Sequence, residues 1–299
     1  MFSNFTAQKI ALAEITLNLR IGGSGPPLLL LHGYPQTHVM WHKVAPALAQ
    51  HFTIVCPDLR GYGDSDAPPS DPQHLTYAKR TVARDLVALM SHLGFETFMA
   101  AGHDRGGRVL HRLLLDHPRR VSRAAVLDIV PTRHIFNTIN QQMATTYEHW
   151  FFLIQPNGFP EHLIGQDSAY YLTTKLHQWS ANPDAFSPAA MAEYLRCFRR
   201  PPVIHATCED YRAAASIDLA HDEADIAQKK KIECPLLVLW GAKGAMEKNY
   251  DVLGVWDSYA KQVQGQALPC GHFVPEEAPN EVVRSLSDFF VHNKESPKI

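Results

Sequence analysis

Short runs of mostly apolar residues recur along the chain and form its clearest pattern. The runs lie at 28–31, 52–56, 98–101, 124–129 and 236–240. Runs of this length are typical of strands with both faces covered, as in a parallel sheet. Residues 9–21 instead alternate apolar and polar residues before a turn rich in Gly and Pro, and we expect one further strand there.

Helical patterns separate several of these strands. Thr76 can cap a helix that runs to Leu93 with apolar residues three or four positions apart, and Gly94 then provides a stop. Residues 279–290 have the same spacing and are expected to form a C-terminal helix. The alternation of strand and helix predicts an α/β fold with a mostly parallel, doubly wound sheet.

The pattern changes between residues 131 and 224. Aromatic-rich helical stretches there are interrupted by prolines, and the strand pattern returns afterwards. We therefore expect a sheet domain in two parts, residues 1–130 and 225–299, with a helical cap inserted at 131–224.

Charge and cysteine usage exclude several classes of partner. With 28 Lys and Arg against 30 Asp and Glu, the chain has no basic excess for nucleic acid or an anionic membrane. No apolar stretch approaches the ~20 residues that span a bilayer, and the N-terminus does not resemble a signal peptide. The five cysteines lack C-x-x-C spacing. We expect a cytoplasmic protein with reduced thiols and with neither nucleic-acid nor membrane partners.

The densest chemical motif is Gly-His-Asp-Arg-Gly-Gly-Arg at residues 102–108, between a predicted strand and a predicted helix. Small residues in a strand–turn–helix context are typical of a nucleophile elbow, and a helix N-terminus favours an anion. Asp104 occupies the middle position. The alternative is that it only caps the helix. A carboxylate that attacks an sp3 carbon expels a leaving group and leaves an ester on the enzyme, so we predict that Asp104 is a nucleophile.

Hydrolysis of such an ester requires a general base and an acid that orients it. His272 lies just before the C-terminal helix, the position of the histidine in the order nucleophile, acid, histidine, and we predict that it is the base. The loop after Trp240 has no acid before Glu247, whereas the run that begins at residue 124 reaches Asp128. We predict that Asp128 orients His272; the alternative is that Asp128 caps the first helix of the insertion.

The oxyanion that develops on the ester needs two N–H donors. We predict the backbone N–H groups of Tyr34, in the motif His-Gly-Tyr-Pro, and of Arg105, next to the nucleophile. His38 and His42 have no third candidate ligand near them in sequence. We therefore expect neither a metal ion nor another cofactor.

Four stretches together resemble the fluoroacetate dehalogenases, a family of the α/β-hydrolase superfamily. They lie at 32–36, 58–65, 102–108 and 147–150. The first two recur in many α/β-hydrolases, whereas the Asp-Arg-x-x-Arg elbow combined with a His-Trp pair in the cap is more specific. The resemblance covers nearly the whole chain. It implies hydrolysis of the carbon–halogen bond of fluoroacetate or a related short 2-haloacid, and a homodimer.

The same resemblance implies roles for five further side chains. It assigns the substrate carboxylate to Arg105 and Arg108, whose guanidinium groups can pair with it through charge-assisted hydrogen bonds. It assigns the departing halide to His149, Trp150 and Tyr211, which can each donate an N–H or O–H. Other tyrosines of the insertion are alternatives to Tyr211.

Two other functions are alternatives on the same fold. An epoxide hydrolase shares the aspartate nucleophile and the histidine, but it needs cap tyrosines to protonate the epoxide oxygen. A neutral epoxide would leave Arg105 and Arg108 without a carboxylate to bind. A catalytically silent ligand receptor on the same fold is the alternative from a different class, and an assay of halide release separates it from an enzyme.

Overall fold

The structure, a computed structural model, describes residues 1–291. Within these residues one sheet has eight strands in the order β1-β2-β4-β3-β5-β6-β7-β8. The strands are β1 (Phe5–Ala11), β2 (Thr16–Gly22), β3 (Pro27–Leu31), β4 (Thr53–Pro57), β5 (Phe98–His103), β6 (Val121–Leu127), β7 (Leu236–Gly241) and β8 (Val263–Leu268). β2 is antiparallel to both β1 and β4, and the other neighbours are parallel. The predicted α/β fold class is confirmed.

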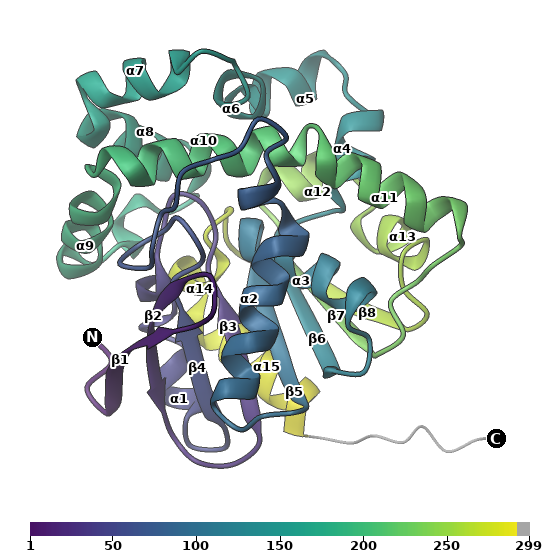
Figure 1. Cartoon of the computed structure of the whole chain (residues 1–299). Helices are drawn as coiled ribbons and strands as arrows, with labels where there is room; N and C mark the ends of the chain where they lie inside the picture. Colours follow the sequence, from purple (N-terminus) through teal and green to yellow (C-terminus); the bar gives the residue numbers. More distant parts are fainter. Residues whose placement is uncertain (292–299) are drawn as a thin grey trace.

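Helices cover both faces of the sheet. Figure 1 shows α2 (Lys79–His92) and α3 (Asp104–Asp116) in front of it and α1 (Ala45–Leu48) and α15 (Pro279–Val291) behind it. Every residue of β5 and β7 is buried as a result. This double coverage explains why the central strands read as continuous apolar runs. The remaining short elements of the sheet domain are η1 (His38–Trp41), η2 (Leu75–Tyr77), α12 (Ala245–Asn249), α13 (Val252–Asp257) and α14 (Val274–Glu277).

A helical segment from Thr132 to Ala227 lies between β6 and β7. Its elements are α4 (Thr132–Asn137), α5 (Gln141–Thr146), α6 (Glu148–Leu153), α7 (Phe159–Gln166), α8 (Ser168–Trp179), η3 (Pro183–Ala185), α9 (Pro188–Phe198), α10 (Pro201–Ala214) and α11 (Ile217–Ala227). Most of these helices gather at one end of the sheet, at the top of Figure 1. We refer to this segment as the cap; that it is a separate domain with limits at residues 131 and 224 stays a prediction.

The prediction of a single strand at residues 9–21 was wrong. This region forms the hairpin of β1 and β2, whose turn is closed by a hydrogen bond from Leu12 N–H to the carbonyl of Ile15, 2.8 Å long. The turn contains no Gly or Pro, so the alternating pattern continues through it without a visible break.

Two further expectations need correction. Helix α2 begins at Lys79 rather than after Thr76, because Asp71 accepts hydrogen bonds from both the backbone N–H and the hydroxyl of Thr76, at 2.7 and 2.8 Å. Strand β8 was not predicted. It is an edge strand with only Leu268 fully buried, so its sequence has no apolar run.

No helix among the described residues is both long and apolar enough to cross a membrane.

Candidate active site

The predicted catalytic residues follow the carboxyl ends of neighbouring parallel strands. Asp104 follows β5, Asp128 follows β6 and His272 lies shortly after β8, while Tyr34 follows β3. The carboxyl ends of parallel strands meet at one edge of a sheet, where open α/β folds bind their ligands. Residues far apart in the sequence are therefore brought together at the end of the sheet that the cap covers (Figure 1).

Asp104 sits in a strained turn between β5 and α3. Its φ of 45° lies in the left-handed region, which side chains rarely adopt. A Cβ at Gly33 would lie 2.5 Å from the Cβ of Asp104, and one at Gly106 would lie 2.3 Å from the carbonyl oxygen of His32. Both positions therefore need glycine. The side chain of Asp104 does not cap α3; its Oδ1 accepts a hydrogen bond of 2.9 Å from the backbone N–H of Tyr34.

The charges around Asp104 favour its ionised form. The residue is 7% exposed, and burial alone would raise its pKa. The positive charges available on His272, Arg105 and Arg108 outweigh burial and lower the pKa below its ordinary value. A carboxylate held ionised in a buried turn is suited to act as a nucleophile.

His272 and Asp128 form a hydrogen-bonded pair. His272 Nδ1 and Asp128 Oδ2 are 2.6 Å apart, and Asp128 Oδ1 accepts from the backbone N–H of Gly241 at 2.9 Å. Asp128 does not cap α4, whose N-cap is Pro131. Burial lowers the pKa of His272, but the hydrogen bond and charge of Asp128, together with the charge of Asp104, raise it above its ordinary value. With Nδ1 engaged, Nε2 is the nitrogen that can take a proton from water.

The two predicted oxyanion donors behave differently. Tyr34 N–H donates to Asp104 Oδ1, the oxygen that would become the carbonyl oxygen of an ester. In the part of the chain that the structure describes, no hydrogen bond joins Arg105 N–H to Asp104. Of the two expected donors, therefore, only Tyr34 N–H is hydrogen-bonded to Asp104 among the described residues.

Arg105 and Arg108 are buried, with exposed fractions of 0% and 3%. Arg105 donates from Nε and Nη2 to the carboxylate of Asp210, at 2.8 and 3.1 Å. Arg108 donates from Nη1 to the carbonyl of Val130 at 2.9 Å and to the hydroxyl of Thr132 at 3.1 Å. Nη1 of Arg105 and Nε of Arg108 are buried without a hydrogen-bond partner among the described residues. Neither arginine is a solvated surface side chain, and each retains a buried donor for an anion.

The three predicted cap residues lie against these arginines. The ring of Tyr211, on α10, faces the guanidinium of Arg105 at 4.1 Å, and the ring of Trp150, on α6, faces that of Arg108 at 4.6 Å. His149 lies 5.6 Å from the Tyr211 ring, centre to centre. The hydroxyl of Tyr211 and Nδ1 of His149 are buried and lack a partner in the described part of the chain. The structure thus gathers all five predicted binding residues in one cluster.

Burial keeps His149 and Tyr211 uncharged. It lowers the pKa of His149 well below its usual range and raises that of the Tyr211 hydroxyl well above its usual range. His149 is therefore a neutral imidazole and Tyr211 a neutral phenol, so each can offer one proton in a hydrogen bond.

Sequence reasoning did not find Trp179, at the end of α8. Its ring lies 4.4 Å from the ring of His149 and 5.9 Å from that of His272, centre to centre, so it packs against both the cap and the core parts of the site. No motif surrounds it, and only its place on a helix of the cap brings it there.

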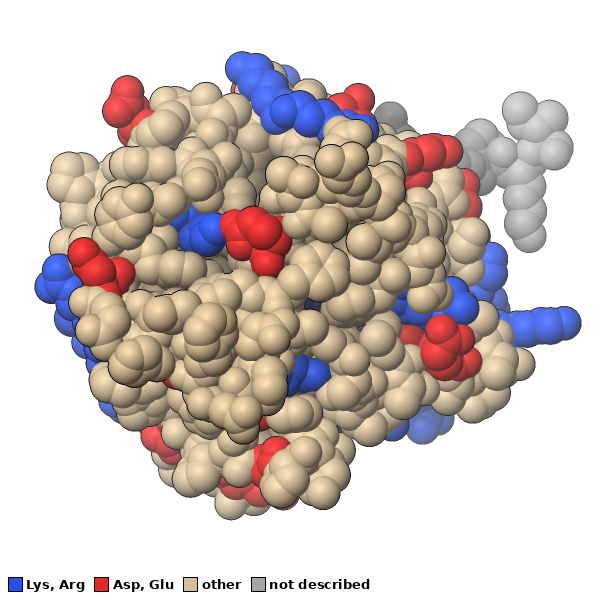
Figure 2. Space-filling view, turned by 90° about the horizontal axis from the view of Figure 1, so that it is seen from above, with Lys and Arg blue, Asp and Glu red and all other residues tan. Residues whose placement is uncertain are grey.

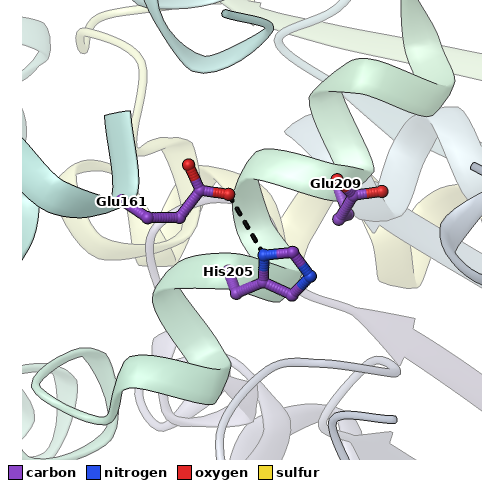
Figure 3. Close-up of side chains that lie close together, drawn as sticks. All are labelled: Glu161, His205 and Glu209. Carbon is purple, nitrogen blue, oxygen red and sulfur yellow. Dashed lines mark hydrogen bonds and ion pairs between the residues drawn. The ribbon is translucent and has the colours of Figure 1, made fainter. Parts of the chain in front are cut away.

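The cap also carries a cluster with the residue types of a metal site. Figure 3 shows Glu161, His205 and Glu209, whose ligand atoms all lie within 4.8 Å of one another. Arg212, however, donates to Glu161 at 2.6 Å and to Glu209 at 2.8 Å. Because a guanidinium already supplies the positive charge between the carboxylates, the cluster is an ion-pair network that joins α7 and α10.

Seen from the cap side, the surface is largely uncharged. Figure 2 shows uncharged side chains over most of this face, with charged ones around its edges and an acidic group beside a basic one nearer its middle. Arg105 and Arg108 are buried, so the positive charge of the site lies inside the molecule. A charge in a desolvated setting attracts an anion more strongly than one in water does.

Comparisons with known proteins agree with this architecture. A family model described as the alpha/beta hydrolase fold matches residues 26–279. A fluoroacetate dehalogenase from Burkholderia sp. is 42% identical over 97% of this chain and 95% of its own length. A soluble epoxide hydrolase from Corynebacterium sp. is 35% identical over 90% of this chain and 91% of its own length. The structure of an α/β hydrolase from Nostoc sp. superposes with a TM-score of 0.96 at 57% identity, covering 98% of this chain and 100% of that one.

The similarity to the Burkholderia and Nostoc proteins extends over almost the entire chain, including the turn at Asp104 and the surrounding sheet. The resemblance to the fluoroacetate dehalogenases is confirmed, although an epoxide hydrolase is also a near relative. The chain belongs to the α/β hydrolase fold family and is a hydrolase.

Proposed function

We propose that this hydrolase removes the halogen from fluoroacetate or a related short 2-haloacid. The observation that carries the proposal is the pair of unpartnered guanidinium donors, Arg105 Nη1 and Arg108 Nε, buried beside an ionised Asp104. A buried charged donor without a partner is costly, and the carboxylate of a haloacid would pair with both arginines. The same contact would hold the carbon next to the carboxylate near the nucleophile.

The first step is a displacement on carbon. A carboxylate oxygen of Asp104 forms a bond to the carbon that carries the halogen, and the carbon–halogen bond breaks with both electrons leaving on the halide. N–H and O–H groups of His149, Trp150 and Tyr211 stabilise the charge that develops on the halide. The result is an ester between Asp104 and the substrate.

The second step restores the enzyme. His272 takes a proton from water, which attacks the carbonyl carbon of the Asp104 ester, while Tyr34 N–H stabilises the oxyanion. The bond between that carbon and the ester oxygen then breaks, and the leaving oxygen takes the proton from His272 to give the 2-hydroxy acid. Asp104 loses the second proton of the water to solvent and returns to its carboxylate form. Asp128 stabilises the imidazolium form of His272 during this step.

Epoxide hydrolysis is the second candidate. The buried hydroxyl of Tyr211, which has no partner among the described residues, could protonate an epoxide oxygen, and the similarity to the Corynebacterium enzyme favours the same core chemistry. A neutral epoxide, however, would leave the free donors of Arg105 and Arg108 unpaired. The dehalogenase proposal accounts for more of the observed groups.

The deciding experiment compares fluoroacetate, chloroacetate, 2-chloropropionate and a simple epoxide on one enzyme preparation, with halide and diol as the measured products. We expect halide release from the haloacids. Diol formation without halide release would overturn the proposal in favour of epoxide hydrolysis. Absence of both halide and diol would indicate a silent receptor.

Oxygen labelling tests the mechanism separately. In a single turnover in heavy-oxygen water with enzyme in excess, the product hydroxyl should come from the unlabelled Asp104, and the label should remain in that side chain. A chiral 2-haloacid should invert, since only one displacement touches its stereocentre. Label in the first product, or retention of configuration, would contradict the ester mechanism.

A further inference from the structure

We propose that Asp210 is a positioning residue that orients Arg105 to bind the substrate carboxylate. The inference rests on the proposed function, because that function makes Arg105 a substrate-binding group. Neither the nucleophile motif nor the cap His-Trp motif includes Asp210, which immediately precedes Tyr211 on α10.

The geometry of the pair fixes the guanidinium plane. Nε and Nη2 of Arg105 donate to Oδ2 and Oδ1 of Asp210 at 2.8 and 3.1 Å, and Nη2 also donates to the main-chain carbonyl of Asp210 at 3.0 Å. Two parallel N–H bonds to one carboxylate hold a planar guanidinium in one orientation. Asp210 thereby takes one edge of the group, and the remaining nitrogen, Nη1, stays buried with no partner in the described residues.

Asp210 is itself held from the other side. The ammonium group of Lys79, at the start of α2, is ion-paired with Asp210 Oδ1, and the hydroxyl of Tyr62 donates to Oδ2 at 2.8 Å. Burial tends to raise the pKa of Asp210, but Arg105 and Lys79 hold it well below its usual range. The carboxylate is therefore a fixed anion on the cap that is bonded to residues of the sheet domain.

Lys79 also limits how far Asp210 neutralises Arg105. A carboxylate paired only with Arg105 would cancel the positive charge that attracts a haloacid. Here Lys79 and Arg105 share the Asp210 carboxylate, so less of the Arg105 charge is cancelled. Lys79 is in turn shared with Asp218, whose Oδ2 lies 3.5 Å from Nζ, so this compensation is partial. Orientation of Arg105 is thus the main role that the geometry assigns to Asp210.

The position of Asp210 on α10 also couples the two parts of the substrate site. The next residue, Tyr211, places its ring 4.1 Å from the Arg105 guanidinium. One turn of α10 therefore fixes the carboxylate-binding arginine and presents a hydroxyl for the halide. Loss of the Asp210 charge should release Arg105 and affect carboxylate binding more than halide binding.

The test measures binding of acetate, an unreactive carboxylate, by titration calorimetry, so that it does not depend on turnover. Asp210→Asn should raise the Kd for acetate by about tenfold or more, the loss expected when a fixed charge-assisted contact is removed. It should also raise KM and lower kcat for chloroacetate, while inhibition by free chloride changes less than twofold. If Asp210 only reduced the charge of Arg105, the variant would bind acetate more tightly; that result or an unchanged Kd would overturn the inference.

Asp222→Asn is the matched control. Asp222 is a similarly buried aspartate on α11 whose Oδ1 accepts from Nη2 of Arg112 at 2.8 Å, away from the predicted site residues. It should lower Tm but leave the Kd for acetate unchanged, which separates loss of a buried ion pair from loss of orientation. Asp210→Glu retains the charge and displaces it by one methylene. If Asp210→Asn does not fold, a higher Kd in Asp210→Glu supports the role, and a wild-type Kd there contradicts it.

The outcomes also separate this inference from the proposed function. Absence of halide release by the wild-type enzyme would refute the function, whereas the acetate measurement would still be possible. Halide release by the wild type together with an unchanged Kd in Asp210→Asn would refute the inference alone.

Discussion

The predicted catalytic residues on the core side and the predicted binding residues on the cap side differ in how their polar groups are satisfied. On the core side, Tyr34 N–H holds Asp104, and His272 is bonded to Asp128. On the side that faces the cap, His149 and Tyr211 each keep a buried polar atom without a partner in the described residues. Buried polar groups are normally paired, so the unpartnered donors indicate where a ligand supplies the missing bonds.

This difference assigns the two sides to different tasks. In the proposed mechanism, the core side would carry the steps that act on the enzyme's own carboxylate, which need fixed partners within the protein. The cap side would act on the substrate, so its groups would be completed only when substrate is bound. Changes on the core side should stop chemistry with any substrate, whereas changes on the cap side should discriminate between substrates.

The largest effect should come from Asp104→Asn. A neutral amide is a far poorer nucleophile than a carboxylate, so halide release from every haloacid should fall by about 10⁴-fold or more. The measurement is initial halide release by protein shown by mass spectrometry to be free of deamidation. Activity near that of the wild type would remove Asp104 from the mechanism.

His272→Asn should separate the two steps on the core side. The first displacement needs no base, whereas hydrolysis of the ester does, so turnover should fall by roughly 10³-fold or more. Intact-mass spectrometry after addition of chloroacetate should show one added carboxymethyl group. Continued consumption of substrate without this adduct would contradict the assigned role of His272.

Arg108→Leu tests the boundary between the two sides. Loss of a buried charge contact with the substrate should reduce kcat/KM for chloroacetate by about 10²- to 10³-fold, with contributions from both KM and kcat. Arg112→Leu, one turn further along α3, is the control. Arg112 pairs with Asp222 and Asp225, so its loss should lower Tm without raising KM. An unchanged KM in Arg108→Leu would place the substrate carboxylate elsewhere.

Trp150→Phe should reveal the selectivity of the cap side. The variant keeps most of the ring but loses the N–H, and fluoride as a leaving group depends more strongly on hydrogen bonding than chloride does. The ratio of fluoroacetate to chloroacetate activity should fall by about tenfold, the equivalent of one hydrogen bond. Trp256→Phe, which removes an N–H bonded to the carbonyl of Ile129, should leave that ratio unchanged. An equal loss of activity with fluoroacetate and with chloroacetate in Trp150→Phe would indicate that Trp150 only packs and does not bind the halide.

The smallest effect concerns pH. The base acts in its neutral form, and the pKa of His272 is raised above 6.5 chiefly because Asp128 and Asp104 outweigh burial. Ester hydrolysis should therefore slow by about tenfold for each pH unit below that pKa. The lowered pKa of Asp104 keeps it ionised over the same range. In profiles of the single-turnover rate against pH, Asp128→Asn should move the acidic limb to lower pH. A limb that does not move would show that Asp128 does not set the pKa of His272.

The core side was largely readable from the sequence. Asp104 is flanked by small residues between an apolar run and a helical pattern, and this local context is sufficient to indicate a nucleophile elbow. Asp128 and His272 follow from their order along the chain relative to predicted strands. Such residues are positioned by regular elements whose signals lie within a few neighbouring positions.

The cap side was much less readable. His149, Trp150 and Tyr211 were identified from a resemblance, since any isolated aromatic on a helix is more often a packing residue. Trp179 and Asp210 gave no signal, because their neighbours in space come from other helices and from the sheet domain. The same limit applies to β8, an exposed edge strand without an apolar run.

The sequence by itself determined the alternating fold through local periodicity and the family through its motifs. It also indicated the three core residues, whose roles stay predictions, through their order along the chain. Only the tertiary structure decided how the charges are partnered: that Asp210 takes one edge of Arg105, that Lys79 shares Asp210, and that selected N–H and O–H groups stay free. A hydrogen bond requires the distance between donor and acceptor to be correct to within a few tenths of an ångström. Here the two atoms belong to residues far apart in the chain, and no sequence pattern encodes their distance directly.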